Sequence, residues 1–242
     1  SPLRASQARP RDRRRYALMT TSHIGLIGGL APRAGIFYYE ELIQQHKAAG
    51  ETLNLTMRHA DVAAVLDHLS RLDRTWLGTY LGGLANELFA AGADFVAVTA
   101  VAPHLAIDEI IDVADGPLVN ALDVLADAVL DAGVERFAVF GNRAVMESNI
   151  WDAVGETTAV QLGQPTLDLV HDLYNDIALT GKRNTEPEVE LLAEFAEQAM
   201  SLGAQAIVLA GSDLSSFYSE APPKYPHIDV AKAHIAQIMA TG

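Results

Sequence analysis

Residues 91–100 read AGADFVAVTA, and residues 202–211 read LGAQAIVLAG, an offset of 111 counted from Gly92 to Gly203. In each stretch an amphipathic segment ends at a glycine, a residue that readily takes the left-handed conformation that closes a helix. A short apolar run follows, which is typical of a strand buried on both faces of a parallel sheet. The two stretches therefore predict the same helix–strand unit twice.

A second matched pair lies nearer the start of each copy. Residues 24–29 read IGLIGG and residues 137–142 read FAVFGN, with an offset of 113 between Gly28 and Gly141. Two pairs in the same order and at nearly the same offset indicate an internal duplication. The alternative is that any α/β protein repeats helix–glycine–strand units, in which case the similarity is incidental.

The remaining pattern alternates short apolar runs with longer amphipathic stretches. Strands are expected at 23–27, 53–57, 95–99, 137–140, 158–161 and 207–209. Helices are expected at 34–48, 74–91, 119–132, 166–180, 186–202 and 230–239. At the start of the fifth helix, Thr185, Pro187 and Glu188 predict a capping box.

This alternation predicts an α/β fold with two pseudo-symmetric lobes, each a parallel sheet flanked by helices. We expect residues 23–118 and 223–242 to form the first lobe, and 119–222 the second. Ligands of such sheets bind beyond the carboxyl ends of the strands. Four segments should therefore face one another across a cleft between the lobes: 28–33, 99–104, 141–145 and 210–215.

The charge of the chain is unevenly distributed. Residues 1–22 hold six arginines and one aspartate, a local charge of +5. Because the whole chain has a net charge of −14, residues 23–242 carry −19. A body this acidic repels phosphate backbones and argues against nucleic-acid binding. The leader, residues 1–22, is interpreted as a disordered basic extension or a remnant added for expression, with Met19 as an alternative start.

Several classes of site and location are disfavoured by the sequence. The chain contains no cysteine, which excludes disulfides, zinc–thiolate sites and thiol nucleophiles. The spacing of Gly25, Gly28 and Gly29 does not match a dinucleotide loop, and the histidines are scattered, so no cofactor and no metal are expected. Without a membrane-spanning apolar run or a secretory signal, we expect a soluble cytoplasmic protein.

Three segments carry a resemblance to a known family. Residues 24–32 read IGLIGGLAP, 99–104 read TAVAPH, and 209–214 read LAGSDL. In this order, with Tyr38-Tyr39 after the first segment, they resemble the aspartate/glutamate racemase superfamily, and its aspartate-racemase branch in particular. The resemblance runs from about Ile24 to the end of the chain. It implies the two-lobed fold, a small carboxylate-bearing substrate and a homodimer.

The resemblance also shows where the chain departs from the family. Ala100 stands at the first catalytic cysteine position and Gly211 at the second, the same two positions that the internal repeat pairs. Two-thiol racemisation places one acid/base group on each face of the substrate carbon, and neither a methyl group nor a hydrogen can transfer a proton. The resemblance therefore excludes racemisation by two thiols and decarboxylation by one.

Substrate-binding residues are expected around these positions. Arg33 and Arg143 suit a carboxylate because a guanidinium donates two parallel hydrogen bonds, although both could simply be solvated surface at a helix start. Val101 and Ala102 replace an Asn-Thr pair of the family, which favours a larger or less polar ligand than aspartate. The full predicted set is Pro32, Arg33, Thr99, Ala100, Val101, Asn142, Arg143, Gly211 and Ser212.

Three residues are the candidates for acid/base catalysis in the absence of thiols. Asp213 matches the family's glutamate beside the second cysteine position. His104 matches the histidine after the first, with helix capping as the alternative. His59 could be a base oriented by Asp61. His234 is expected to be structural.

Two functional hypotheses follow. The first is a cofactor-independent isomerase, lyase or cyclase that acts on a small carboxylate-bearing molecule with acid/base groups other than thiols. The second is a catalytically inactive racemase homologue that binds a carboxylate ligand or a protein partner. Acid/base groups converging on one ligand atom would favour catalysis, whereas an apolar cleft with a carboxylate clamp would favour binding.

Overall fold

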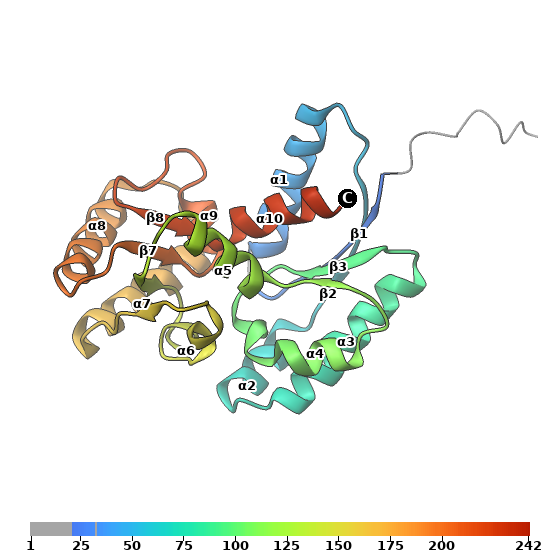
Figure 1. The fold of residues 1–242 in the computed structure, drawn as a ribbon, viewed down its shortest axis with the longest axis horizontal. Helices are drawn as coiled ribbons and strands as arrows, with labels where there is room; N and C mark the ends of the chain where they lie inside the picture. The colour runs from blue at the N-terminus through green and yellow to red at the C-terminus, as the bar shows by residue number, and fades with distance from the viewer. Residues whose placement is uncertain (1–20, 32) are drawn as a thin grey trace, which may run out of the picture.

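A computed structural model describes residues 21–31 and 33–242, and the predicted leader and Pro32 lie outside these residues apart from Thr21 and Ser22. The chain forms two four-stranded parallel sheets with helices packed around them (Figure 1). Their strand orders are β2-β1-β3-β4 and β6-β5-β7-β8, so the second sheet repeats the topology of the first. The predicted α/β fold with two similar lobes is confirmed.

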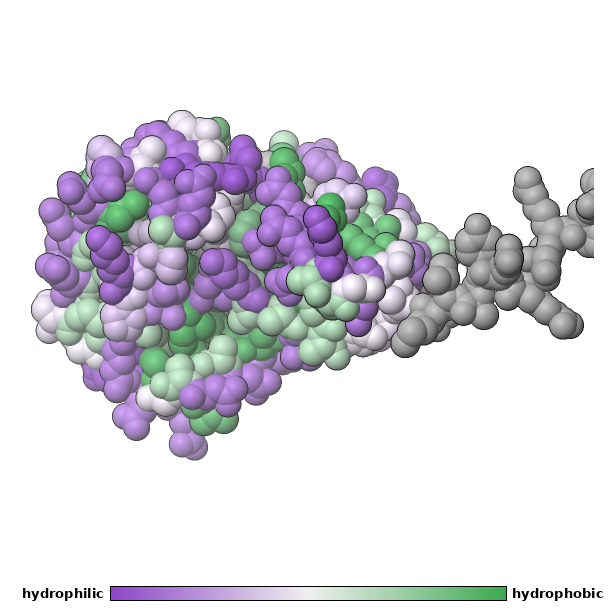
Figure 2. Space-filling model, turned by 90° about the horizontal axis from the view of Figure 1, so that it is seen from above, coloured by the Kyte–Doolittle hydropathy of each residue, from purple (hydrophilic) through white to green (hydrophobic). Residues whose placement is uncertain are grey.

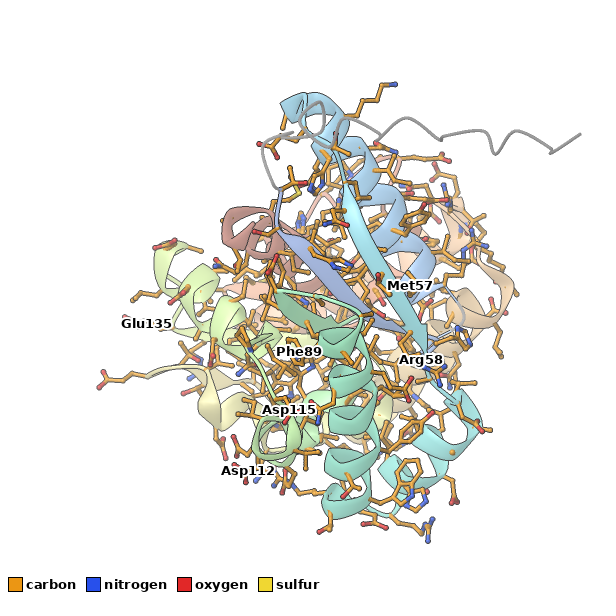
Figure 3. All side chains as sticks on the ribbon, turned by 90° about the vertical axis from the view of Figure 1, so that its right-hand side faces the viewer. Met57, Arg58, Phe89, Asp112, Asp115 and Glu135 are labelled. Atoms are coloured by element: carbon orange, nitrogen blue, oxygen red, sulfur yellow. The ribbon has the colours of Figure 1, made fainter. Side chains whose placement is uncertain are left out.

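The strands of the first sheet are β1 (His23–Gly28), β2 (Asn54–His59), β3 (Phe95–Val98) and β4 (Leu118–Val119). Those of the second are β5 (Arg136–Phe140), β6 (Thr158–Ala159), β7 (Ala206–Leu209) and β8 (His227–Asp229). The central strands β1, β3, β5 and β7 are almost entirely buried, as their Val, Ile and Phe content predicts. Figure 3 shows β2 at the outer edge of the first sheet, with Met57 and Arg58 labelled.

The long helices are α1 (Ala34–Ala49), α3 (Arg74–Ala90), α5 (Ala121–Asp131), α7 (Gln164–Thr180), α8 (Glu186–Ser201) and α10 (Val230–Thr241), each close to its expected range. The short ones are α2 (Val62–Ser70), α4 (Ile107–Val113), α6 (Arg143–Met146), α9 (Ser212–Phe217) and the 3₁₀ turns η2 (Ala102–Ala106) and η3 (Ile150–Ala153). These short elements and the edge strands β4 and β8 were not predicted from the sequence, because runs of so few residues carry little periodicity.

The expected return of the chain to the first lobe at residue 223 needs a correction. The strand β8 pairs with β7 in the second sheet, so the return comes only with α10. Ile235 and Ile238 of α10 share one core cluster with Ile24 and Leu26 of β1. Figure 1 shows α10 beside α1, which lies on the first sheet.

The helix α8 begins where expected, with Pro187 in its first turn, but the predicted capping box does not form. Thr185 is the residue before the helix, as predicted, but its hydroxyl makes no capping hydrogen bond. The carboxylate of Glu188 instead accepts a hydrogen bond from Lys182, with an Nζ–Oε1 distance of 2.6 Å. The ion pair therefore takes the acid that the capping box would use.

The surface of the molecule is mostly polar. Figure 2 shows mainly hydrophilic side chains on the face seen from above, with small apolar areas among them. Within the described part of the chain, no helix combines the length and apolar character needed to cross a membrane.

The helices α3 and α4 pack unusually closely because glycines line their contact. A β-carbon placed on Gly78 would lie 2.5 Å from the β-carbon of Glu109 and 2.8 Å from its backbone. One placed on Gly82 would lie 2.6 Å from Val113. Gly83, one residue further along α3, has open space around it.

We predict that Gly78→Ala and Gly83→Ala have opposite effects on stability. Alanine favours a helix over glycine by about 0.5–1 kcal/mol, so Gly83→Ala should raise the free energy of unfolding by roughly that amount. In Gly78→Ala the clash with α4 backbone should outweigh this gain and lower it by about 1–3 kcal/mol. Urea denaturation of both variants tests this, and a stabilised Gly78→Ala would contradict the close helix contact.

Candidate functional site

A cleft of about 670 Å³ opens between the two lobes. Each of the four predicted strand-end segments contributes to its lining: Leu30 and Ala31, Ala102, Asn142 and Arg143, and Asp213. The prediction that these segments face one another is therefore confirmed. Residues of α2 from the first lobe and of α6 and α7 from the second line the cleft, and Figure 1 shows α2 and α6 at the lower side of the molecule.

The two walls of the cleft differ in character. The first-lobe wall is apolar apart from Ser70 and consists of Leu30, Ala31, Val62, Leu66, Leu69 and Ala102. The second-lobe wall contains nearly all the polar groups: Asn142, Arg143, Glu147, His171, Tyr174, Asn175 and Asp213. A bound molecule would therefore meet hydrogen-bonding groups on one side and hydrocarbon on the other.

One face of α7 forms much of the polar wall. His171, Tyr174, Asn175 and Ala178 are spaced by three and four residues, which brings their side chains to one side of the helix. The ring of His171 accepts a hydrogen bond at Nδ1 from the backbone N–H of Arg143, at 3.0 Å. The Nε2 of the same ring lies 3.0 Å from the side-chain amide nitrogen of Asn175.

Tyr174 occupies the space beside Gly211, the position that the resemblance aligns with the second cysteine. A β-carbon placed on Gly211 would lie 2.5 Å from Cε2 of Tyr174 and 2.7 Å from its hydroxyl oxygen. No side chain fits at 211 while the ring is in place. The hydroxyl of Tyr174 donates a hydrogen bond to Oδ2 of Asp213, at 3.1 Å.

Asp213 is the acid best placed to react in the cleft. Its side chain lies at the start of α9 and is only 2% exposed. Tyr174 contacts Oδ2, whereas Oδ1 is buried without a hydrogen-bond partner. Burial raises the pKa of the carboxyl, against opposing effects of the Tyr174 hydroxyl and of Arg33. Burial, with the charge of Asp213 second, also holds the pKa of Tyr174 well above its usual range.

Arg33 extends from the first lobe to the second. Its Nη1 would lie 2.7 Å from a β-carbon on Gly181, which follows α7 with a φ of 65°. Its Nε is buried without a partner, and its backbone N–H and, to a smaller extent, its positive charge lower the pKa of Asp213. Arg33 therefore acts on the site through Asp213, while Pro32 beside it lies outside the described residues.

The segment after β5 supplies the polar rim. The side chain of Asn142 caps α6 by accepting a hydrogen bond from the Val145 N–H at 2.9 Å, which leaves its amide NH₂ free to donate. Arg143 pairs with Asp168 at 2.7 Å and is 38% exposed. Both predicted binding residues line the cleft.

His104 is buried away from the cleft lining. Its Nδ1 donates to the Ala100 carbonyl at 2.9 Å, and its Nε2 accepts from the Ala121 N–H at 3.2 Å. Burial lowers its pKa to about 4. These contacts give His104 a structural role in joining η2 to α5, so we withdraw it as an acid/base candidate.

His234 is structural, as its position at the core suggests. It contacts the Tyr38 hydroxyl at 2.9 Å and the Val119 carbonyl at 2.8 Å. Burial lowers its pKa to about 3, with His104 adding a smaller effect.

The proposed pair of His59 and Asp61 does not form. The ring of His59 lies against Gly29 at the exposed end of β2, outside the residues that line the cleft. The Asp61 carboxylate caps α2 by accepting from the backbone N–H groups of Ala63 and Ala64, each at 3.1 Å. His59 therefore lacks the orienting acid that the prediction required.

The remaining predicted binding residues have internal partners or no polar group. Thr99 donates its hydroxyl proton to the Ile27 carbonyl at 3.0 Å, and Ser212 donates to the Thr99 carbonyl at 3.4 Å across the lobes. Ala100 is half-buried and Val101 is buried, and neither lines the cleft. Among the described residues, no group of three or more His, Asp or Glu side chains could hold a metal ion.

The sequence did not predict that the helices α2 and α7 form the walls of the cleft. The lining residues that were not predicted are His171, Tyr174 and Asn175 on α7, and Val62 and Leu66 on α2. The spacing of the polar residues within a helix that also has a buried apolar face was the available signal on α7. Only the tertiary structure shows which face of either helix borders the cleft.

Comparison with known proteins places these features in context. The family model described as Asp/Glu/hydantoin racemase matches residues 27–238. The fold is similar to a Yersinia pestis protein assigned as an Asp/Glu racemase, with a TM-score of 0.78 and 18% identity over 91% of this chain and 99% of that one. It is also similar to an aspartate racemase homologue from Pyrococcus horikoshii OT3, with a TM-score of 0.73 and 20% identity over the same shares. An arylmalonate decarboxylase matches with a TM-score of 0.54 and 14% identity over 91% and 94%.

We predict that Gly211→Ala destabilises the protein only while Tyr174 is present. The added methyl group collides with the ring, and such overpacking lowers the free energy of unfolding by about 1–3 kcal/mol. In a Tyr174→Ala background the space is vacant, so the same substitution should have little effect. A double-mutant cycle from urea denaturation measures the coupling, and equal losses in both backgrounds would contradict it.

We also predict that the two buried histidines make the protein less stable in acid. An unfolded histidine binds its proton near pH 6.5, whereas the folded pKa values are about 4 for His104 and about 3 for His234. Between these values the unfolded state binds more protons, so the free energy of unfolding falls as the pH falls, by about 2 kcal/mol per histidine from pH 7 to pH 5.

The His104→Asn variant isolates one of the two contributions. It should be less stable at pH 7, because a buried hydrogen bond is altered, yet lose about 2 kcal/mol less than the wild type between pH 7 and pH 5. The other titrating groups contribute to both proteins and cancel in the difference, apart from the small effect of His104 on the pKa of His234. An unchanged loss between the two pH values would show that His104 is not held neutral.

Proposed function

The chain belongs to the Asp/Glu/hydantoin racemase family, and from this premise we propose that it is a cofactor-independent isomerase, lyase or cyclase without thiol catalysis. Its substrate would be a small carboxylate-bearing molecule bound between the lobes. Asp213 would be the acid/base group and Tyr174 its hydrogen-bond donor.

A single observation carries this proposal. At Gly211, the position aligned with a catalytic cysteine, the space for a side chain is filled by Tyr174, whose hydroxyl binds Asp213. The Oδ1 of Asp213 is a buried polar atom without a partner, and it is the one such atom among the described residues that line the cleft. This contact supports the proposal that the Tyr174–Asp213 pair takes over the acid/base role at this position.

The proposed chemistry follows from the roles of the two groups. An ionised Asp213 would accept a proton at Oδ1 from the substrate and later return it. Tyr174 would stay protonated, because its pKa lies well above the usual range, and would stabilise the carboxylate through Oδ2. Burial raises the pKa of Asp213 above that of an exposed aspartate, which makes its carboxylate a stronger base.

The reaction would use one face of the substrate only. Asp213 and Tyr174 belong to the second lobe, and the opposite wall is apolar apart from Ser70. Racemisation by two bases needs a proton donor on each face, whereas elimination, decarboxylation and proton shifts on one face need a single group. The one-sided wall therefore favours a lyase or a one-face isomerase over a racemase.

The substrate carboxylate would bind at the rim formed by Asn142 and Arg143. The Asn142 amide has a free NH₂ group, and the Arg143 guanidinium presents N–H donors beyond those that face Asp168 at 2.7 Å and Glu147 at 3.8 Å. A carboxylate there would lie on the same wall as Asp213.

The second candidate function is a non-catalytic homologue that binds a carboxylate ligand or a protein partner. The apolar first-lobe wall favours it, because binding requires no acid/base group on either face. The two functions differ in whether a bound molecule exchanges protons.

We predict that Asp213→Asn abolishes proton exchange while leaving ligand binding. Carboxylic acids that raise the melting temperature would be incubated in D₂O and followed by NMR for deuterium uptake or conversion. Asp213→Asn should lower the rate by at least about 100-fold, and Tyr174→Phe by a smaller factor. Tyr225→Phe is the matched control, since Tyr225 pairs with Tyr218 outside the cleft lining.

The pH dependence gives a further check on the assignment. Because Asp213 acts in its ionised form, the rate should rise with pH through a pKa higher than that of an exposed aspartate. Tight binding without exchange in the wild type would reject the catalytic proposal for that ligand and favour the binding protein.

A further inference from the structure

Large apolar side chains are exposed along the cleft. Leu66 is 53% exposed, Val62 is 37% exposed, and Leu179 on the opposite wall is 79% exposed. Single exposed leucines are ordinary on a protein surface, but several that line one concave site mark a binding surface. The cleft thus has apolar surface in contact with water that a ligand could cover.

The geometry of α2 explains why this surface stays open. Val62, Leu66 and Leu69 recur at intervals of four and three residues and so share one side of the helix. On another side, His68 stacks on Trp76 of α3 with ring centroids 3.8 Å apart.

The stack continues along α3 and reaches the start of α2. Trp76 stacks on Tyr80 at 4.7 Å, and the Tyr80 hydroxyl accepts a hydrogen bond from the Asp61 N–H at 2.8 Å. These contacts fix α2 against α3. Its apolar side is therefore held in place instead of collapsing onto α7.

We propose that the ligand of this cleft is a carboxylic acid whose remaining part is an apolar group at least the size of a phenyl ring. This rests on the proposed function, which places the carboxylate at Asn142 and Arg143. The apolar group would lie against Val62 and Leu66, and Leu66 would be the main determinant of specificity.

Size and surface chemistry both support this substrate class. A volume of about 670 Å³ is in the range of sites for drug-sized molecules, well above the needs of a four-carbon amino acid. A polar dicarboxylate would leave the leucine wall in water or bury its second carboxylate against hydrocarbon, which is unfavourable. An apolar group removes both problems.

The test compares three probes by calorimetry: 3-phenylpropionate, propionate and aspartate. In the wild type, 3-phenylpropionate should bind at least about tenfold more tightly than the other two, because the ring covers apolar surface. In Leu66→Asn this preference should fall to about threefold or less. Leu66 is exposed, so the variant should fold normally and keep its melting temperature.

A matched control is available on another helix. Leu130 of α5 is 77% exposed and lies outside the cleft lining, so Leu130→Asn should keep the full preference. Equal affinities for the three probes, no binding of 3-phenylpropionate at millimolar concentrations, or an unchanged preference in Leu66→Asn would each overturn the proposal.

The same variants separate this inference from the catalytic proposal. The binding preference involves no turnover, so Asp213→Asn should retain it even though proton exchange is lost. Preference without exchange in the wild type would support the apolar ligand and reject catalysis. Proton exchange of aspartate with no preference for the aromatic probe would support catalysis and reject the apolar ligand.

Discussion

The ring of Tyr174 packs against the backbone at Gly211, and the arrangement of polar groups in the cleft depends on that contact. Because a β-carbon at 211 would lie within 2.5 Å of the ring, the position aligned with a thiol can carry no side chain. The same contact brings the Tyr174 hydroxyl to Asp213 and leaves one carboxylate oxygen free. The absence of a side chain at 211 and the formation of the Tyr174–Asp213 pair are thus two aspects of one packing arrangement.

Most of the scaffold could be predicted from the sequence because its signals are local. The strands β1, β3, β5 and β7 are buried on both faces and read as short apolar runs after glycines. The edge strands β4 and β8 were missed, because two or three residues carry no periodicity and their pairing is decided by neighbours distant in sequence. For the same reason the boundary of the second lobe was placed too early.

The site was less predictable than the fold. Asp213 was found because it follows a strand end, a position that topology fixes. His104 follows a strand end too, yet the chain turns it inward to backbone groups of Ala100 and Ala121. Tyr174 lies in mid-helix, 39 residues from Asp213 in sequence, so no local pattern joins the two. Residue type and position therefore identified the candidates, whereas side-chain direction separated functional from structural ones.

The repeated topology supplies two similar halves, but the cleft between them is not symmetric. The helix that follows the edge strand β2 is α2, and the one that follows β6 is α7, so the two walls come from corresponding places in the repeat. One wall presents Val62 and Leu66, and the other presents His171 and Tyr174. A symmetric pair of acid/base groups suits a reaction that treats both faces of a carbon alike. A wall of hydrocarbon opposite a wall that carries Asp213 suits a reaction in which acid/base chemistry acts on one face of the ligand only.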